Sequence, residues 1–552
     1  MASLNPLNET LGLRRAKHLL RRATFNYTKE QLDSFAAMNA TAAVNSIATN
    51  PTNILAEPYD PLPNGAPDGF WLSSTAHPNT FGGQGRKRSH ITAWWWYNAI
   101  NQVSLKHKLS FFLHTSFTVA KDSGAGLSPF FYDHIRLLDF YALGNIKTLA
   151  KKITLDNAML DYLDNTQNNK NNPNENYARE YLELFTILKG EQIGEGNYTN
   201  YTELDIQQAA KVFSGFKKKY DRNGDIDPDT NLPIGYLALG QHDTNNKTFS
   251  SAFGGHTITG RSTASGMMEE LSDFVEMVFA QPETAKAYCR KLYRYFVKSS
   301  WNDTIETDII GPLAQQLIAN NYEILPVVKT LLSSQHFYDA DDGDATDNII
   351  GAIIKSPLQL LSEVCTLFEV SFPDPSTNAL RFYNNFYHKF IHNTYYKSAG
   401  MEIYNPDSVA GYPAYYQEPS FDRIWFSSNT LIGRYKLIES LIIGRNTIDP
   451  NANIYATLDT VAFVENKIDP NDAKDPNLLV HKIAELLYPE SIDTDRTDYF
   501  KTFLIEDSDD YYWTGAWLQY INTHNQADKT VVKLRLDALI TGMVNAAEFQ
   551  LM

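Results

Sequence analysis

The chain has 552 residues, 43% of them hydrophobic and 20% charged, which is typical of folded proteins and not of disordered ones. A single simple core does not hold a chain of this length, so we expect two or three packed subdomains. The formal net charge of −16 argues against nucleic-acid binding, because phosphate recognition needs a concentrated basic surface.

Apolar residues recur at i, i+3, i+4 and i+7 along most of the chain, which predicts a mainly α-helical, elongated multi-helix bundle. Capping patterns support it: Thr28 precedes Gln31, Thr202 precedes Asp205, and Pro282 begins a helix. The predicted helices are 9–24, 30–48, 91–120, 128–151, 174–190, 203–216, 267–298, 305–319, 323–334, 351–369, 428–443, 477–488 and 530–548.

One small β-hairpin element is expected within 213–262, because 221–225 is rich in turn-forming Asp, Asn and Gly. An acidic, Gly-containing stretch near 340–350 predicts a boundary between an N-terminal helical domain, 1–345, and a C-terminal one, 346–552. The acidic segment 489–512 is expected to be solvated surface. Long Asn/Gly-rich loops, which often line sites, are expected at 51–90, 164–175, 217–265, 371–380 and 396–422.

No apolar run reaches the ~18 residues that a membrane-spanning helix needs, so we do not expect an integral membrane protein. Residues 1–6 lack the features of a signal peptide. The chain is therefore expected to be cytoplasmic, to have lost a leader, or to be exported with a partner. Cys289 and Cys365 lie in apolar helical runs, which favours buried thiols.

The segment 174–186 places one arginine and three carboxylates on one face of a predicted helix. Glu175, Arg179 and Glu183 follow at i, i+4 and i+8, so Arg179 is expected to bridge both carboxylates, with Glu180 beside them. This face is either a solvated row of ion pairs, each contributing ~0.2–0.5 kcal/mol, or a buried set holding an acid of raised pKa or a polar ligand.

Two further helices carry basic candidates. His114 lies seven residues after His107, ~10 Å along a helix axis, so one metal ion cannot bind both; His114 is a core histidine or a proton-transfer group. His18, Arg21 and Arg22 form either an anion-binding face or a basic face paired with the protein's own acids.

The loop at 217–265 carries the remaining candidates. His242 and Asp243 point to opposite faces of an extended segment, so they are not expected to pair with each other; either Asp243 serves another basic group or the two form a polar turn. Alternating acids beyond residue 220 resemble the start of a calcium loop but lack its Gly and final Glu, so an Asx-rich turn is the alternative. The calcium candidates are Asp221, Asn223, Asp225 and Asp227.

Several chemistries are excluded by missing motifs. The chain contains no G-x-S-x-G elbow, no H-E-x-x-H and no P-loop, and no G-x-G-x-x-G between a strand and a helix. These absences argue against nucleotide-dependent catalysis, and the residues imply no particular cofactor.

Ordered motifs along nearly the whole chain resemble a bacterial family catalogued as domain of unknown function 1800. Ser116 replaces the second His of the family's paired-His helix, which weakens the case for a two-histidine metal site, and Tyr412 replaces a Trp. The resemblance implies pairing with a sulfatase-like protein of the alkaline-phosphatase superfamily. The motifs are 18–25, 94–96, 108–117, 173–186, 242–248, 291–297, 355–357 and 409–413, with Arg434 following.

Two functional hypotheses follow. The first is an enzyme-like pocket walled by helix 174–190, helix 105–119, helix 9–24 and loop 240–260, performing acid–base or hydrolytic chemistry on a glycan or peptide. Arg179 would orient a carboxylate, one Glu would act as acid or base, and His114 would transfer protons. Its catalytic candidates are His114, Glu175, Arg179, Glu180 and Glu183, and its substrate-binding candidates are His18, Arg21, Arg22, His242, Asp243 and Tyr412.

The second hypothesis is a non-catalytic binding or assembly partner of an exported or cell-surface complex. Its aromatic loops 71–96 and 404–426 would contact the sulfatase-like protein or a surface polymer. Burial discriminates between the two, because an enzyme needs Arg179 and the acids in a concave, partly dry pocket. A scaffold needs the same residues exposed or mutually satisfied.

Overall fold

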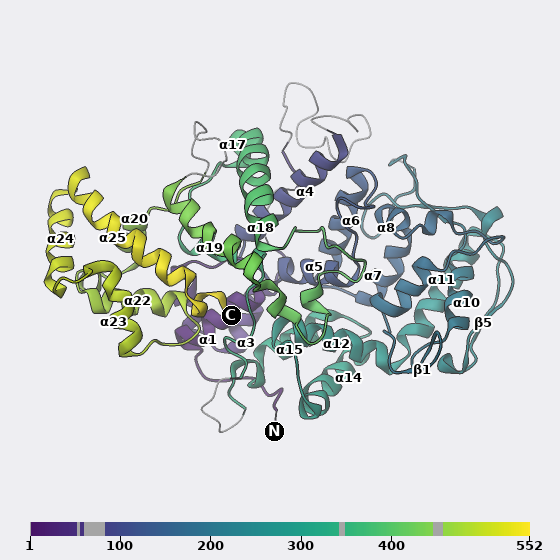
Figure 1. The fold of residues 1–552 in the computed structure, drawn as a ribbon. Coiled ribbons are helices and arrows are strands. Elements are labelled where there is room, and N and C mark those ends of the chain that lie inside the picture. The colour runs from purple at the N-terminus through teal and green to yellow at the C-terminus, as the bar shows by residue number, and fades with distance from the viewer. Residues whose placement is uncertain (1, 52–55, 60–82, 223, 342–347, 445–455) are drawn as a thin grey trace.

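A computed structural model describes residues 2–51, 56–59, 83–222, 224–341, 348–444 and 456–552. The molecule is mainly helical and elongated (Figure 1). Helices from the last hundred residues form one end, residues from about 150 to 280 form the other, and the first helix and the C-terminus lie near the middle (Figure 1).

The helices of the first part of the chain lead from the centre to the far end and back. They are α1 (Gly12–Ala23), α2 (Lys29–Ala36), α3 (Ala40–Ile47), α4 (Gly83–Ile100), α5 (Leu105–Ser116), α6 (Ser128–Tyr141), α7 (Ile146–Lys152), α8 (Asn157–Tyr162), α9 (Asn176–Glu180), α10 (Glu203–Val212), α11 (Ala264–Phe279), α12 (Pro282–Phe296), α13 (Asp303–Ile305), α14 (Gly311–Ala319) and α15 (Ile324–Ser333).

The helices of the second part begin at the centre and build the opposite end. They are α16 (Pro357–Leu367), α17 (Pro375–Leu380), α18 (Lys397–Ala399), α19 (Ser428–Ile443), α20 (Thr460–Lys467), α21 (Pro470–Ala473), α22 (Pro476–Leu487), α23 (Thr494–Ile505), α24 (Asp510–Thr523) and α25 (Gln526–Asn545). Three π-helical segments, Tyr181–Phe185, Glu306–Ile310 and Arg381–Tyr396, continue α9, α13 and α17.

Strands are few and short. The hairpin predicted within 213–262 is confirmed as two antiparallel pairs, β3 (Phe216–Lys217) with β4 (Tyr236–Leu237) and β5 (Lys247–Thr248) with β6 (Thr257–Ile258). A third pair, β1 (Gln192–Gly194) with β2 (Asn197–Tyr198), was not expected. Strands of two or three residues are too short to show the alternation by which a sequence reveals them.

Local capping chemistry sets several helix starts as predicted. The Thr28 and Thr202 side chains each form a capping box, with Gln31 and Asp205 as the reciprocal partners, and Pro282 occupies the first turn of α12. The predicted helix 91–120 is two helices, because Ser104 caps α5 after a break at 101–104. The segment 489–512 is not simply solvated surface, since Phe500 and Leu504 of α23 are buried.

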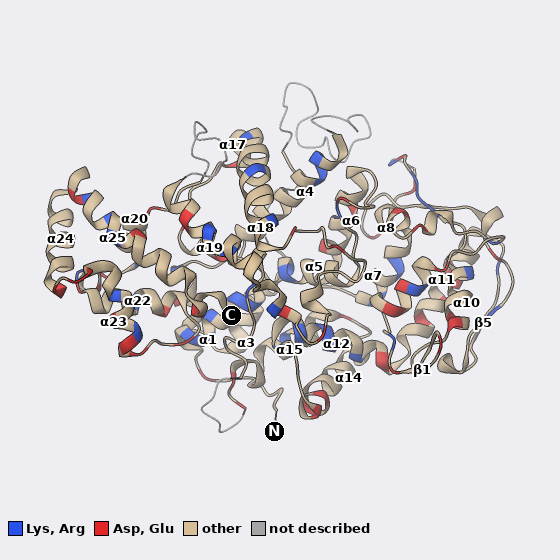
Figure 2. Ribbon diagram, in the orientation of Figure 1, with Lys and Arg blue, Asp and Glu red and all other residues tan. Residues whose placement is uncertain are grey.

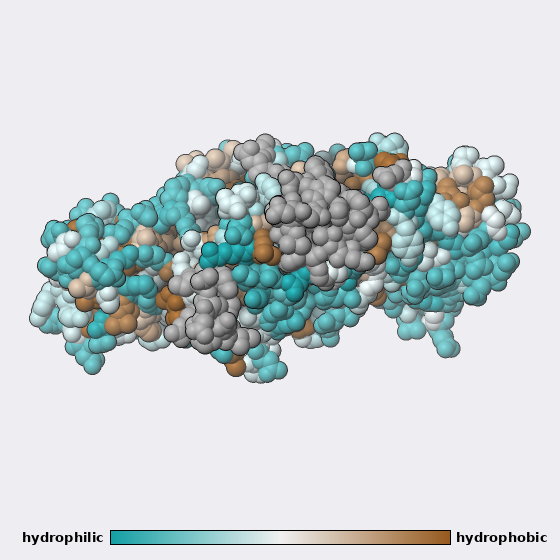
Figure 3. All heavy atoms as spheres, turned by 90° about the horizontal axis from the view of Figure 1, so that it is seen from above, coloured by the Kyte–Doolittle hydropathy of each residue, from teal (hydrophilic) through white to brown (hydrophobic). Residues whose placement is uncertain are grey.

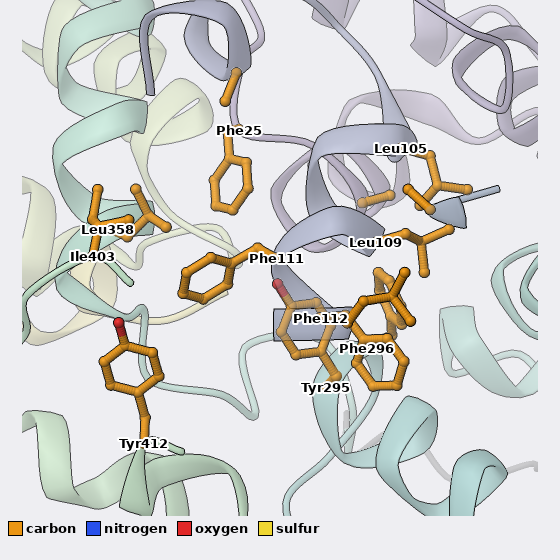
Figure 4. Packing of buried hydrophobic residues seen from close by; sticks show 14 of the residues in the cluster. Phe25, Leu105, Leu109, Phe111, Phe112, Tyr295, Phe296, Leu358, Ile403 and Tyr412 are labelled. Carbon is orange, nitrogen blue, oxygen red and sulfur yellow. The ribbon is translucent and has the colours of Figure 1, made fainter. Parts of the chain in front are cut away.

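The core is centred on α5, whose apolar side chains meet residues from distant parts of the chain (Figure 4). Phe111 and Phe112 lie between side chains of α12, α16, the segment after α1 and the loop after α18 (Figure 4). Each such buried side chain stabilises the fold by roughly 1.5–3 kcal/mol. The labelled members are Phe25, Leu105, Leu109, Phe111, Phe112, Tyr295, Phe296, Leu358, Ile403 and Tyr412.

A buried ion cluster fastens α1 to the C-terminal half of the chain. Arg21 Nε donates to Glu363 Oε1 of α16 at 2.9 Å, and Lys355 Nζ lies 2.8 Å from Glu363 Oε2. Burial alone would raise the pKa of Glu363, but Arg21 and Lys355 hold it below its usual value. Arg21 also donates to the Leu487 carbonyl oxygen at the end of α22, at 2.6 Å.

Arg22 extends the connection through main-chain oxygen atoms. Its guanidinium donates to the carbonyl oxygens of Val297, Ile349 and Met552 at 2.6–3.0 Å. Figure 2 shows the basic residues of α1 at the centre of the molecule, beside the C-terminus. The domain boundary at 345/346 stays a prediction, and α1 contacts both sides of it.

The surface seen from above is mostly hydrophilic, and its hydrophobic atoms form small separate patches (Figure 3). Among the described residues, no helix is long and apolar enough to cross a membrane.

Replacing Glu363 by Gln should lower the free energy of unfolding by about 3–5 kcal/mol, because Arg21 would remain charged and buried without a counter-ion and Lys355 would lose its ion-pair partner. Glu490 provides a matched control, since it pairs at the surface with Arg14 of the same helix, at 2.6 Å. Glu490→Gln should cost less than about 1 kcal/mol. Urea unfolding measures the free energy of unfolding of both variants. Equal decreases would contradict the conclusion that the buried cluster stabilises the fold more than a surface ion pair does.

Candidate functional site

The 174–186 segment is short and partly exposed. It consists of α9 followed by the π-helical turn Tyr181–Phe185, so the helix ends earlier than the predicted residue 190. Arg179 forms two hydrogen bonds with Glu203 of α10, at 2.7 and 3.1 Å, and a longer contact with Glu175 at 3.4 Å. About 36% of each of these three side chains is exposed. This part of the face is a mutually satisfied ion network.

The prediction that Arg179 bridges Glu175 and Glu183 is wrong for Glu183. The chain reverses after the π-helical turn and brings Lys189 back to form an ion pair with Glu183. Tyr201 also donates to the Glu183 carboxylate, at 3.3 Å. Arg179 binds Glu203 of α10 instead of Glu183, which the helical spacing had predicted as its partner.

Glu180 has an unusual electrostatic setting. Burial, and to a smaller extent the neighbouring Glu183, raise its pKa to about 7. A carboxyl group with this pKa exchanges protons near neutrality, as a general acid requires. Glu180 does not line the pocket described below.

His114 is a buried histidine of the core. Its Nε2 lies 3.1 Å from the Val119 carbonyl oxygen, and its ring packs edge-on against Tyr404. Burial lowers its pKa to about 3, so the imidazole stays neutral at physiological pH. The acid closest in this network is Asp156, which contacts His134 Nδ1 at 2.8 Å; the rings of His134 and His114 are 6.2 Å apart.

The basic candidates of α1 lie in the central cluster and not beside α9. Arg21 and Arg22 are about 99% buried, and their contacts are the protein groups described above. His18 is also buried, packed against Phe337 and Tyr338. These three residues hold the fold together.

As predicted, His242 and Asp243 do not pair with each other. His242 contacts the Ser214 carbonyl oxygen at 2.8 Å through Nδ1 and Glu270 at 3.3 Å through Nε2. Asp243 accepts from the backbone of Asn245 in a turn. Lys247 also forms an ion pair with Glu270 of α11, so these residues attach the loop to its own neighbours, and none of these contacts is to His18, His114 or Arg179.

Tyr412 is buried and organises a loop. Its hydroxyl donates to the Glu402 carbonyl oxygen at 2.5 Å and accepts from the Asn405 amide at 3.2 Å. Its ring stacks on Phe111 of α5. The aromatic loops expected at a partner surface are therefore largely internal: 404–426 holds buried Tyr404 and Trp425, and the described part of 71–96 belongs to α4.

The described calcium candidates bind lysine and backbone groups. Asp225 pairs with Lys219 and Asp227 with Lys152, while Asp227 Oδ1 accepts from the backbone amides of Asp229 and Thr230. These bonds make an Asx-rich turn. Asn223 lies outside the described residues.

Four chain segments do converge on one pocket of about 360 Å³. They are the end of α5, the π-helical turn after α9, α12, and the loop that contains Tyr412. Each carries one of the motifs quoted for the family resemblance. The lining residues include Phe112 and Ser116 from α5, Glu183 and Leu184 from the π-helical turn, Lys189, then Arg290, Lys291, Arg294 and Tyr295 from α12, and Ala410, Tyr415 and Glu418 from the loop.

Two cations of this pocket have unusual partners. Lys291 Nζ donates to the Leu184 carbonyl oxygen at 2.6 Å, and burial, assisted by Arg294, lowers the lysine pKa to about 7. The Arg294 guanidinium lies over the rings of Phe421, at 4.5 Å, and Trp301, at 5.0 Å. Neither forms an ion pair with a carboxylate in the part of the chain that the structure describes.

Two other pockets offer weaker chemistry. A larger one of about 730 Å³ lies between α7, α11 and the 225–237 loop, but Lys147 and Lys152 there are paired with Glu276 and Asp227. In a second, of about 490 Å³, Asp341 contacts His336 Nδ1 and Tyr293 contacts Nε2. Burial raises the pKa of Tyr293, so the phenol keeps its proton, and both ring nitrogens of His336 already have partners.

Sequence reasoning placed Glu183 at the pocket and missed Lys291, Arg294 and Tyr415. The available signal was a cation without a carboxylate one helical turn away: neither Lys291 nor Arg294 has an acid at i±3 or i±4. Many surface lysines share that signal, so it becomes informative only with burial.

A family model described as "Protein of unknown function (DUF1800)" matches residues 18–551. The chain belongs to this family. No curated protein and no solved structure matches it. The pocket, its four walls and every described candidate residue lie within the matched DUF1800 region.

Glu180→Gln should change stability in a pH-dependent manner. Because the folded-state pKa is raised, the native carboxyl holds its proton between about pH 4.5 and 7 and stability is lost as pH rises through 7. The Gln variant should therefore match wild type at pH 4.5 and be more stable at pH 8, by about 1 kcal/mol after screening of this partly solvated group.

Glu203→Gln is the matched control for this measurement. Arg179 lowers the pKa of Glu203, so its removal should destabilise the protein at pH 8 and have less effect at low pH. Urea unfolding at both pH values measures the two variants. A Glu180→Gln difference that does not vary with pH would show that Glu180 titrates normally.

Proposed function

We propose that this DUF1800 protein binds an anionic group of a glycan or peptide in the pocket between α5 and α12 and performs acid–base chemistry on it. The observation that carries the proposal is the pair Lys291 and Arg294, two cations at one pocket that form no direct ion pair with a carboxylate among the described residues, although Glu418 acts on Arg294 at longer range. A desolvated cation lacking a counter-ion is a preformed site for a carboxylate or sulfate.

The pocket also carries the elements of recognition and proton transfer. Arg294 is fixed between aromatic rings and would orient the anion, the role first assigned to Arg179. Lys291 has its pKa at about 7 and would exchange a proton with the ligand, the role first assigned to His114. Phe112, Tyr295 and Tyr415 line the same space and suit contact with a sugar ring or peptide side chain.

A non-catalytic role as an assembly partner is the alternative. It is favoured by the exposed, mutually satisfied network of Arg179, Glu175 and Glu203, which matches what a scaffold requires. The partner implied by the resemblance is a sulfatase-like protein of the alkaline-phosphatase superfamily. Under this alternative the pocket would hold an anionic side chain of that partner and catalyse nothing.

Anion binding should weaken as pH rises through 7. The Lys291 amine is charged below its pKa and neutral above it, so affinity for a short oligogalacturonate or a sulfated disaccharide should fall about ten-fold between pH 6 and pH 8. Isothermal titration measures this. Lys291→Arg should bind the anionic ligand equally well at pH 6 and pH 8. Lys291→Met should bind it weakly at both pH values.

Lys286→Met is the control, because Lys286 lies on the same helix and pairs at the surface with Glu283. It should leave the pH profile unchanged. A wild-type affinity that is independent of pH, or no affinity for any anionic ligand, would remove the basis of the proposal.

Turnover separates the two functions. If the pocket is catalytic, Lys291→Arg should bind the ligand but convert it at least ten-fold more slowly, because a guanidinium does not exchange its proton at neutral pH. Mass spectrometry of a ligand library after incubation detects conversion. Ligand that binds with the predicted pH dependence and is never converted would establish the assembly role.

A further inference from the structure

Three chain segments bring metal-ligating side chains together beside the loop organised by Tyr412. Asp122 follows α5, His392 lies on the π-helical segment Arg381–Tyr396, and Glu402 follows α18. One ligand atom from each lies within 4.8 Å of the others. His392 Nε2 and Glu402 Oε2 are 3.2 Å apart.

The hydrogen bonds of His392 direct an acceptor toward the two carboxylates. Nδ1 lies 3.0 Å from the Asn393 side-chain oxygen, an acceptor, so Nδ1 carries the proton. Nε2 then faces Glu402 and Asp122, and it has no hydrogen-bond partner although His392 is about 93% buried. An imidazole nitrogen and two carboxylates that face one point are a ligand set suited to a cation.

The π-helical segment places a second histidine beside His392. His388 lies four residues earlier on the same segment. The His388 ring stacks on the His392 ring with centroids 5.5 Å apart. His388 Nδ1 has no hydrogen-bond partner.

The loops that carry the carboxylates are held in place by other bonds. Asn405 accepts from the Asp122 amide at 2.8 Å and donates to Glu402 Oε2 at 3.1 Å. The Tyr412 hydroxyl bonds the backbone of both Glu402 and Asn405. Such outer contacts orient ligands before a metal ion arrives. Lys121 contacts Asp122 Oδ2 at 2.6 Å, which leaves the second carboxylate oxygen for a metal.

We propose that Asp122, His392 and Glu402 bind a divalent transition-metal ion. Imidazole nitrogen combined with carboxylate oxygen suits Zn²⁺, Mn²⁺, Fe²⁺ or Co²⁺, whereas Ca²⁺ selects oxygen ligands alone. Three protein ligands leave coordination positions for water or substrate, as in catalytic zinc sites. The metal site shares no residue with the anion pocket.

Titration of the chelator-treated full chain with Co²⁺, followed by visible absorption, tests the site. We expect one equivalent to bind with the spectrum of a nitrogen- and oxygen-ligated ion, and Zn²⁺ to displace it. His392→Ala and Glu402→Gln should each weaken binding at least about ten-fold.

Asp122→Asn is the variant that should still fold, because about 44% of this side chain is exposed. It should leave the circular dichroism spectrum unchanged and weaken Co²⁺ binding. His256→Ala, at an exposed histidine outside the group, should bind as wild type does. The proposal is overturned if wild type binds no Co²⁺, or if Asp122→Asn and Glu402→Gln bind it with unchanged affinity.

Discussion

One buried carboxylate, Glu363, compensates two buried cations at the centre of the molecule. Arg21 and Lys355 are both fully enclosed, and each carries a desolvation cost that only a close counter-ion and well-placed acceptors can offset. The remaining donors of Arg21 and Lys355 reach carbonyl oxygens near the ends of α22 and α25. The arrangement of the two ends of the molecule therefore depends on α1 keeping its position.

Arginine and lysine side chains have different roles in this protein, depending on whether a carboxylate lies beside them. Arg179 and Lys189 find carboxylates, Glu203 and Glu183, at the surface, and their charges are largely neutralised there. Arg294 and Lys291 are enclosed by aromatic rings and a carbonyl oxygen instead. In a protein with a large excess of acid, such unneutralised cations are the positions at which a ligand anion gains most.

The loop around Tyr412 connects the two candidate sites. Ala410 and Tyr415 line the anion pocket, and the Tyr412 hydroxyl holds the backbone that carries Glu402. Phe111 supports the Tyr412 ring from α5. A ligand that moves this loop would change both sites, because no more than a few residues separate them along the chain.

The sequence by itself determined the helical class, many helix starts and the family. These depend on local chemistry: periodicity produced α19 at its predicted bounds, and the caps at Thr28 and Thr202 act within three residues. Local rules failed where a break or a widened turn intervened, as at 101–104 and in Arg381–Tyr396. The Arg381–Tyr396 segment is rich in Phe and Tyr, but that composition does not distinguish a π-helix from an α-helix.

Only the tertiary structure decided which polar residues form a site. The partner of Arg179 comes from another helix, and that of Arg21 is 342 positions away. Helical spacing gives the direction of a side chain but not the distant group that will meet it. Convergence of remote segments distinguished Lys291 from the other lysines and His392 from the other histidines, because Lys291 lines a pocket beside Arg294 and His392 faces two carboxylates.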